Sequence, residues 1–291
     1  MTPAAPIVGL VSAGEMGSAL GATLRRGGAT VLTAVGGRSD RTRRLAERAG
    51  LTLVDGLDEV VSRSAVLLSV VPPQEALAAG TRLIERAVHL DVRPLLVDLN
   101  AVAPTDVAAL GELAAGADVP FVDGSISGAP PDAGHGRTRV LLAGARAADV
   151  AGLPWTDVDV SVVGERIGAA SAAKMCTGGV RKGTTALLIN ALLTAAEYGV
   201  LEPVAAELRR ATGRDPAVEV ELAASKAWRF VPEMEAVAET QASAGLDPST
   251  YRAIAEIFGR TADSPLANRR PEDVDRSGSD LSSITEQLRP R

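Results

Sequence analysis

The first half of the chain alternates short apolar runs with longer segments of helical period. The runs are rich in Val, Leu and Ile and fall at residues 7–11, 30–35, 65–70, 95–98, 121–123, 139–143 and 158–163. Buried parallel strands joined by helical crossovers produce this pattern, because both faces of such strands are covered. The pattern therefore predicts an α/β fold with a doubly wound parallel sheet.

The pattern changes after Gly164. No further strand runs occur, and helices are predicted at 169–198, 203–211, 217–229 and 232–244. The stretch from Thr261 onward is polar and contains proline, which predicts a loosely attached tail with at most a short terminal helix. The expected domains are an α/β domain at 1–163, an all-helical domain at 164–262 and a tail at 263–291.

Composition excludes several classes of function. The 291 residues carry a net charge of −6, and only 2% are aromatic, so the chain offers neither a basic field nor stacking platforms for nucleic acid. One cysteine, Cys176, permits no internal disulfide, which predicts a cytoplasmic location. Residues 186–196 form the strongest apolar stretch, which is shorter than the ~20 residues that cross a bilayer, so no membrane partner is expected.

The turn after the first predicted strand carries a glycine pattern. Gly14 and Gly17 occupy the second and third positions of GxGxxG, and Ser12 replaces the first glycine. Such a turn predicts a Rossmann domain in which the segment Ser12, Ala13, Gly14, Glu15 and Met16 holds a pyrophosphate at a helix N-terminus. The alternative is a plain turn of small residues.

The second strand ends without the carboxylate that binds the ribose 2'-hydroxyl in NAD enzymes. Gly36 and Gly37 stand there, and Arg38 and Ser39 follow. A guanidinium and a hydroxyl without a repelling charge suit a 2'-phosphate, so NADP is predicted over NAD. The same residues also suit a solvent-exposed helix start.

Several segments together resemble the β-hydroxyacid dehydrogenase family, which includes 3-hydroxyisobutyrate and 6-phosphogluconate dehydrogenases. They are GLVSAGEMG, LLSVVPP, VDLNAVAP, FVDGSISGAPPDAGHGRT and GERIGAASAAKMCTGG, and they span most of residues 1–200. The resemblance implies a Rossmann domain followed by a helical domain, a homodimer, and an active site in the cleft between the domains. It also implies that Val70, Val71, Pro72 and Asn100 hold the nicotinamide ribose.

The resemblance further implies a substrate site. Ser127, Gly128 and Ala129 match the family's carboxylate-binding loop, with alanine in place of the third glycine, and Lys174 matches the family's general acid/base. Hydride transfer from a carbinol carbon requires the hydroxyl proton to leave, and a lysine is able to take it. Cys176 lies roughly 200° around the helix from Lys174 and is predicted to be a core thiol.

The chain departs from the family after the lysine. Thr177 and Gly178 replace an asparagine pair, and Arg181 replaces the glutamate of 6-phosphogluconate dehydrogenases. Phosphogluconate is therefore not expected as the substrate. Thr177 is still expected to contact substrate. Whether Arg181, Arg229 and His135 contact substrate is left open.

Residues near 226–250 resemble the C-terminal helical domain of a less characterised branch of these enzymes. This resemblance implies that Trp228 and Glu233 lie at the substrate. Packing between helices explains the two aromatic residues, Trp228 and Phe230, equally well. The prediction is an NADP-dependent oxidoreductase acting on a small hydroxy or oxo substrate, with a 3-hydroxy acid favoured. An imine reductase and a non-catalytic NADP-binding sensor are the alternatives. No metal-ligand spacing appears in the sequence.

Overall fold

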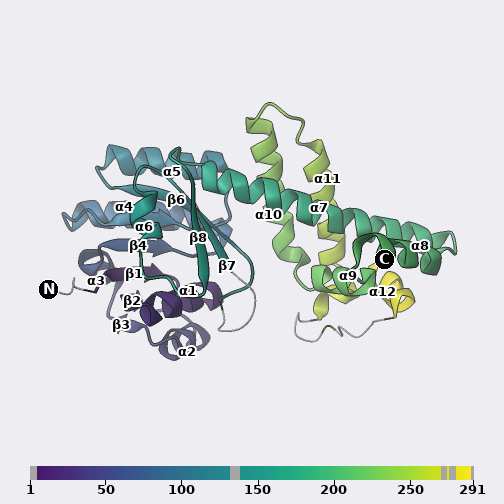
Figure 1. The fold of residues 1–291 in the computed structure, drawn as a ribbon, viewed down its shortest axis with the longest axis horizontal. Helices are drawn as coiled ribbons and strands as arrows, with labels where there is room; N and C mark the ends of the chain where they lie inside the picture. The colour runs from purple at the N-terminus through teal and green to yellow at the C-terminus, as the bar shows by residue number, and fades with distance from the viewer. Residues whose placement is uncertain (1–4, 132–137, 270–273, 275–279, 290–291) are drawn as a thin grey trace. The chain divides into compact units, whose positions relative to one another are not determined.

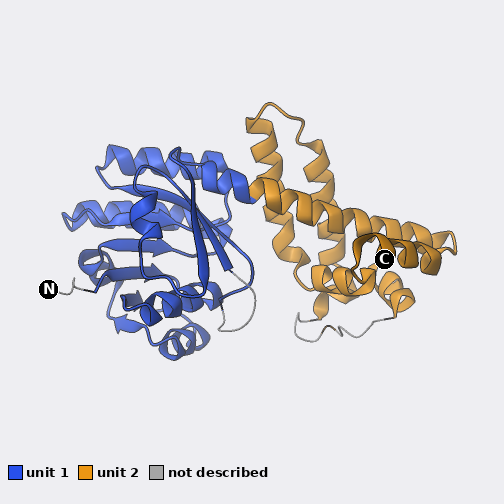
Figure 2. Ribbon diagram, viewed as in Figure 1, with its two compact units in different colours: residues 1–174 blue, residues 175–291 orange. Residues whose placement is uncertain are grey.

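The chain divides into two compact units in a computed structural model that describes residues 5–131, 138–269, 274 and 280–289. Unit 1 comprises residues 1–174 and unit 2 comprises residues 175–291 (Figure 2). The helix α7 (Ala169–Glu197) begins in unit 1 and continues into unit 2 (Figure 1). His135, for which the sequence left a substrate contact open, lies outside the described residues.

Unit 1 contains one eight-stranded sheet with the order β3-β2-β1-β4-β5-β6-β7-β8. The order 3-2-1-4-5 is that of the Rossmann fold. The expected α/β class is therefore confirmed. The strands are β1 (Ile7–Val11), β2 (Thr30–Ala34), β3 (Thr52–Val54), β4 (Val66–Ser69), β5 (Leu95–Asp98), β6 (Phe121–Ser127), β7 (Thr138–Ala143) and β8 (Val158–Gly164).

Helices cover both faces of this sheet (Figure 1). One core joins the sheet to three helices through residues such as Leu20, Leu24 and Val150, and a second core on the other face contains Leu83 and Leu110. Burying each leucine stabilises the fold by about 1.5–3 kcal/mol. The first face carries α1 (Glu15–Arg26), α2 (Asp40–Arg48) and α6 (Ala147–Ala151), and the second carries α3 (Leu57–Arg63), α4 (Ala76–His89) and α5 (Pro104–Gly116).

Two features of the sheet differ from the sequence prediction. Strand β3 was not predicted, because its three residues are too few to show a period. Strand β7 pairs with β6 in antiparallel orientation, whereas a wholly parallel sheet was expected. Residues 128–137 between them are too few for the helical crossover that a parallel pair requires.

The junction of β1 and α1 is tightly packed. A Cβ atom on Gly17 would lie 2.2 Å from the backbone oxygen of Ser12, so only glycine permits this approach of helix to strand. Ser12 adopts a positive φ of 73°, a region that costs a residue other than glycine about 1 kcal/mol or more. The turn therefore keeps the geometry of the glycine motif although its first glycine is missing.

Unit 2 is helical in the described part of the chain, as the sequence predicts. After α7 come α8 (Leu201–Thr212), α9 (Pro216–Ala224), α10 (Ala227–Ser243), α11 (Ser249–Ala262), the short 3-10 helix η2 (Pro265–Asn268) and α12 (Leu281–Leu288). Phe230 of α10 meets Phe258 of α11 edge to face, with ring centroids 5.1 Å apart. This aromatic pair contributes to the core of the unit.

Three helical predictions were wrong in detail. The break between α9 and α10 lies at Ser225 and Lys226, and Pro232, expected to begin a helix, is inside α10. Helix α11 was not predicted. The terminal helix α12 is packed rather than loose, because Leu281, Ile284 and Leu288 are buried at a helical spacing of three and four residues.

No helix in the described part of the chain is both long and apolar enough to cross a membrane.

Candidate functional site

The carboxyl ends of parallel strands β1, β4, β5 and β6 meet at one edge of the sheet of unit 1. In open α/β sheets this edge binds ligands at the point where the strand order reverses, here between β1 and β4. A cavity of about 330 Å³ lies there, lined by Ser12, Gly36, Arg38 and Val71 among others. Three residues predicted to bind the cofactor, Ser12, Arg38 and Val71, thus reach one cavity from three separate loops.

The predicted phosphate turn lies at the N-terminus of α1. Gly14 is the N-cap of this helix, and no side chain caps it, so the first backbone N–H groups are available to an anion. A Cβ on Gly14 would find its nearest neighbour, Ser12 Oγ, 4.0 Å away, so packing within the chain does not require glycine here. Ala13 is buried, Met16 is half-buried in the core, and Glu15 is exposed. This open cradle fits a dinucleotide pyrophosphate.

Arg38 is exposed and lines the cavity, and no ion pair to a described residue occupies it. Its neighbour Ser39 is the N-cap of α2 and accepts a hydrogen bond from the backbone N–H of Thr42 at 3.3 Å. Ser39 thus has a structural role that the sequence did not reveal. Arg41 forms an ion pair with Glu15 on the exposed surface instead of lining the cavity.

Sequence reasoning missed three charged residues of this cavity, Arg82, Asp55 and Glu75. Arg82 of α4 lines it without an ion pair to a described residue, and Asp55, which follows β3, lies on its wall. Asp55 was missed because β3 itself was not predicted. Arg82 lies on the exposed face of a crossover helix, where a single arginine gives no sequence signal.

Asn100 is buried and ties together the ends of two strands. Its Oδ1 accepts the backbone N–H of Val71 at 2.7 Å, and its Nδ2 donates to Ser69 Oγ at 3.1 Å and to Asp98 Oδ1 at 2.5 Å. These hydrogen bonds fix the loop of Val70, Val71 and Pro72 at the carboxyl end of β4. Asn100 therefore positions the loop predicted to hold the nicotinamide ribose.

Two buried carboxyl groups lie on neighbouring strands beneath this network, because Asp98 and Asp123 are register partners in β5 and β6. Burial raises the pKa of Asp98 from 3.8 to about 7, hydrogen bonds from Asn100 oppose the rise, and Asp123 adds a further upward shift. Burial also raises the pKa of Asp123, against hydrogen bonds from Ser171, Ala170 and Gly168. Asp98 therefore titrates within the physiological range of pH.

Replacing Asp98 with asparagine is expected to flatten the pH dependence of stability. In the folded protein the carboxyl group of Asp98 keeps its proton up to about pH 7, whereas in the unfolded chain the same group loses it near pH 4. The free energy of unfolding therefore falls as pH rises between these values. Relative to Asp98→Asn, the wild type should lose about 3 kcal/mol between pH 5 and pH 8. Urea unfolding at both pH values measures this, and equal slopes in the two proteins would contradict it.

Asp123 joins β6 to the start of α7. Its Oδ2 accepts the backbone N–H groups of Gly168, Ala170 and Ser171 at 2.8–3.2 Å, and its Oδ1 accepts the hydroxyl of Ser171 at 2.7 Å. A carboxylate at a helix N-terminus satisfies the unpaired N–H groups there. Ser125 Oγ, two residues along the same face of β6, donates to the Ala170 carbonyl at 3.0 Å. The first turns of α7 are thus fixed alongside β6.

Lys174 lies one turn further along α7. Its Nζ donates a hydrogen bond of 2.6 Å to the carbonyl oxygen of Ile126, next to Ser127 at the carboxyl end of β6. Gly128 has a φ of 111°, which favours glycine, and Thr138 Oγ1 donates to the Ala129 carbonyl at 2.6 Å. The predicted acid/base and the predicted carboxylate loop are therefore adjacent within unit 1.

The predicted residues of unit 2 have varied surroundings. Glu233 forms an ion pair with the buried Lys182, whose Nζ also lies 5.2 Å from the ring centroid of Phe230. Trp228 is 66% exposed, and Thr177, Arg181 and Arg229 are exposed as well. The ammonium group of Lys182 thus packs on the Phe230 ring.

The prediction that Cys176 is a core thiol was wrong, because Cys176 is exposed. The buried stripe of α7 runs through Met175, Gly179, Lys182 and Ala186, at spacings of three and four residues. Met175 therefore occupies the core position, and Cys176 is turned about 100° away from it.

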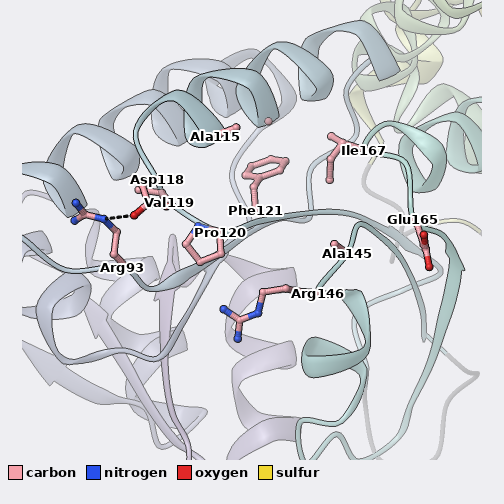
Figure 3. Close-up of a pocket in the computed structure, with 11 residues that line it drawn as sticks. Arg93, Ala115, Asp118, Val119, Pro120, Phe121, Ala145, Arg146, Glu165 and Ile167 are labelled. Carbon is pink, nitrogen blue, oxygen red and sulfur yellow. Dashed lines mark ion pairs between the residues drawn. The ribbon is translucent and has the colours of Figure 1, made fainter.

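A larger pocket of unit 1 lies at the opposite edge of the sheet, where β6 begins (Figure 3). Figure 3 shows Phe121 and Ile167 on its wall and Arg93 directed toward Asp118, with which it forms an ion pair of 3.7 Å. Arg146 also lines this pocket and pairs with Asp149 at 2.7 Å. With both arginines paired, this pocket offers no evident site for a charged ligand.

Comparisons with known proteins agree with this fold. The NAD binding domain of 6-phosphogluconate dehydrogenase matches residues 7–155, half of the chain, and a domain of unknown function (DUF1932) matches residues 195–261. Fold and site define the class of proteins with a nicotinamide-dinucleotide-binding Rossmann domain followed by a helical region. Within that class, the chain belongs to the family that carries the NAD binding domain of 6-phosphogluconate dehydrogenase.

Three individual proteins illustrate the relationship. The conserved protein MTH1747, of unknown function and described as structurally similar to 3-hydroxyacid dehydrogenases, is 29% identical, with a TM-score of 0.70 over 88% of this chain and 97% of that one. Mycobacterium tuberculosis 3-hydroxyisobutyrate dehydrogenase shares the fold at 18% identity, with a TM-score of 0.71 over 98% and 99% of the two chains. An uncharacterised 28.5 kDa protein of Methanothermus fervidus is 25% identical over 71% of this chain and 78% of its own.

Proposed function

We propose that the chain is an NADP-dependent oxidoreductase acting on a small substrate with a hydroxyl or oxo group and a carboxylate, of the 3-hydroxy acid type. The observation that carries the proposal is the hydrogen bond from Lys174 Nζ to the Ile126 carbonyl. It brings a proton-exchanging group to the carboxyl end of β6, at the edge that binds ligands in this fold. The matched NAD binding domain supports the cofactor class.

Separate groups of residues bind the cofactor, bind the substrate and transfer the proton in this proposal. The turn of Ser12 to Met16 holds the pyrophosphate, and Arg38 and Arg82 hold the 2'-phosphate. The bound nicotinamide supplies the hydride acceptor or donor. Ser127 and the backbone of Gly128 bind the substrate carboxylate. Lys174 takes the hydroxyl proton during oxidation and returns one during reduction.

Turnover of a substrate panel tests the reaction class. NADPH oxidation is followed by absorbance against 3-oxo acids, short aldehydes and cyclic imines, with NADH as the comparison. Activity on 3-oxo acids and no activity on imines supports the proposal. Activity on imines alone would favour an imine reductase, and tight NADPH binding without any turnover would favour a sensor. The homodimer and the cytoplasmic location stay predictions.

Replacing Arg38 with alanine tests the cofactor preference. Hydrogen bonds to a charged group contribute about 1.5–3 kcal/mol, so KM for NADPH should rise about tenfold or more while KM for NADH stays within about twofold. Arg43→Ala is the matched control, because Arg43 is exposed on α2 and does not line the cavity. Equal losses with both cofactors would contradict the assignment of Arg38 to the 2'-phosphate.

A further inference from the structure

Unit 2 contains a pocket of its own. It has a volume of about 950 Å³ and is formed by α7, α9, the start of α10 and the loop before α9. This volume is in the range of small-molecule sites. Thr177, predicted from the sequence to contact substrate, lines this pocket, whereas Lys174 and the Ser127 loop do not.

The pocket is lined by more positive charge than negative charge. Four cationic side chains face it, and two of them are neutralised: Lys182 pairs with Glu233, and Arg214 pairs with Glu219 at 3.0 Å. Arg181 and Lys226 have no ion pair with a described residue. Two uncompensated cations therefore border one hollow.

The position of Lys226 adds to this field. Lys226 is the N-cap of the seventeen-residue helix α10, whose first turn contains no acidic residue and has no side-chain cap. The N-terminus of a helix carries a partial positive charge, so a cation there is unfavourable unless an anion is nearby. Arg181 lies on the same pocket wall as Thr184 and Thr185, whose hydroxyl groups donate to the backbone carbonyls of Val180 and Arg181, so the cations carry the positive field of this wall.

The remaining wall is apolar. Val180 is 67% exposed although it is aliphatic, and Leu222, Ala223 and Phe230 also line the pocket. Lys182 is held against the Phe230 ring by its ion pair with Glu233, so this wall is rigidly built. An apolar surface beside two unpaired cations is complementary to a molecule with a hydrocarbon body and an anionic end.

We propose that this pocket binds a small organic carboxylate, with its anionic group between Arg181 and Lys226 and its apolar body on Val180, Leu222 and Phe230. A carboxylate with an apolar body has two possible sources: a separate effector molecule, or the distal end of an extended substrate. This proposal concerns ligand binding and is tested by binding alone, so it does not depend on the proposed oxidoreductase activity.

Calorimetric titration of the full chain with hexanoate at low ionic strength tests the site. Arg181→Gln and Lys226→Gln should each weaken hexanoate binding about tenfold. Val180→Ser, at an exposed position, should weaken hexanoate by severalfold. The neutral analogue hexan-1-ol should bind at least about tenfold more weakly than hexanoate, since it lacks the charge.

Arg210→Gln is the matched control, because Arg210 is 77% exposed on α8, pairs with Glu207 and does not line the pocket. It should leave hexanoate binding within about twofold. The substituted side chains other than Lys226 are exposed, and thermal melts confirm that each variant is folded. Unchanged hexanoate binding in the Arg181→Gln/Lys226→Gln double variant, or no binding to the wild type, overturns the proposal.

A second arm distinguishes the two sources of the carboxylate once a substrate is known. Hexanoate that raises KM without changing kcat in the wild type, but not in the Arg181→Gln/Lys226→Gln double variant, identifies the pocket as part of the substrate site. Hexanoate that binds without competing with substrate identifies a separate effector. Absence of turnover in the panel would remove the oxidoreductase proposal and leave the calorimetric result on this pocket unaffected.

Discussion

Replacing Lys174 with alanine is expected to lower kcat by about two to four orders of magnitude, the range that general acid/base groups contribute. NADPH affinity should change little, because the residues proposed to hold the cofactor lie on other loops. The hydrogen bond from Lys174 Nζ to the Ile126 carbonyl holds the side-chain nitrogen of the lysine beside the Ser127 loop. Alanine at this position lacks the group that exchanges the substrate proton. Steady-state kinetics with the best substrate of the panel measures the loss.

Two further variants separate proton exchange from charge. Lys174→Arg keeps a cation but cannot release a proton near neutral pH, so it should be nearly as inactive as Lys174→Ala. A small primary amine added to Lys174→Ala should restore part of the activity, which a purely structural role does not predict. Turnover near the wild-type rate in Lys174→Ala would refute the acid/base assignment.

Replacing Asp123 with alanine is expected to destabilise unit 1 by about 5 kcal/mol. The substitution leaves three buried backbone N–H groups at the start of α7 without their acceptor, and each orphaned group costs about 1–3 kcal/mol. Because the same contacts fix the helix that carries Lys174, kcat should fall as well. The fluorescence of the half-buried Trp155, in unit 1, reports the unfolding transition in urea.

Asp123→Asn is the matched comparison for this prediction. The amide oxygen still accepts the three N–H groups, and the amide nitrogen is able to donate to the Ser171 hydroxyl, so the cost should be about 1–2 kcal/mol. Asp149→Ala, which breaks an exposed ion pair with Arg146, should cost less than about 1 kcal/mol. A loss below about 1 kcal/mol in Asp123→Ala would show that α7 begins there without help from this carboxylate.

The sequence by itself determined the fold class and the location of the tight turn between β1 and α1. Parallel strands buried on both faces must be continuous apolar runs, and close packing of α1 on β1 must use a residue as small as Gly17. Both requirements act over a few consecutive residues, so they are visible in one chain without its structure. Lys174 was found differently, through a family pattern in its neighbours.

The tertiary structure alone decided the features that depend on residues far apart in the chain. Asp123 caps a helix that begins 46 residues later. Burial and the neighbouring Asp123 raise the pKa of Asp98, against hydrogen bonds from Asn100. Arg82 and Asp55 reach the cavity at the carboxyl ends of β1 and β4 from elements whose local sequence gives no hint of it. The pairing of Lys182 with Glu233, which leaves Arg181 and Lys226 as the uncompensated cations of their pocket, likewise joins separate helices. Hydrogen bonding, burial and charge compensation are properties of three-dimensional neighbours, so no local pattern encodes them.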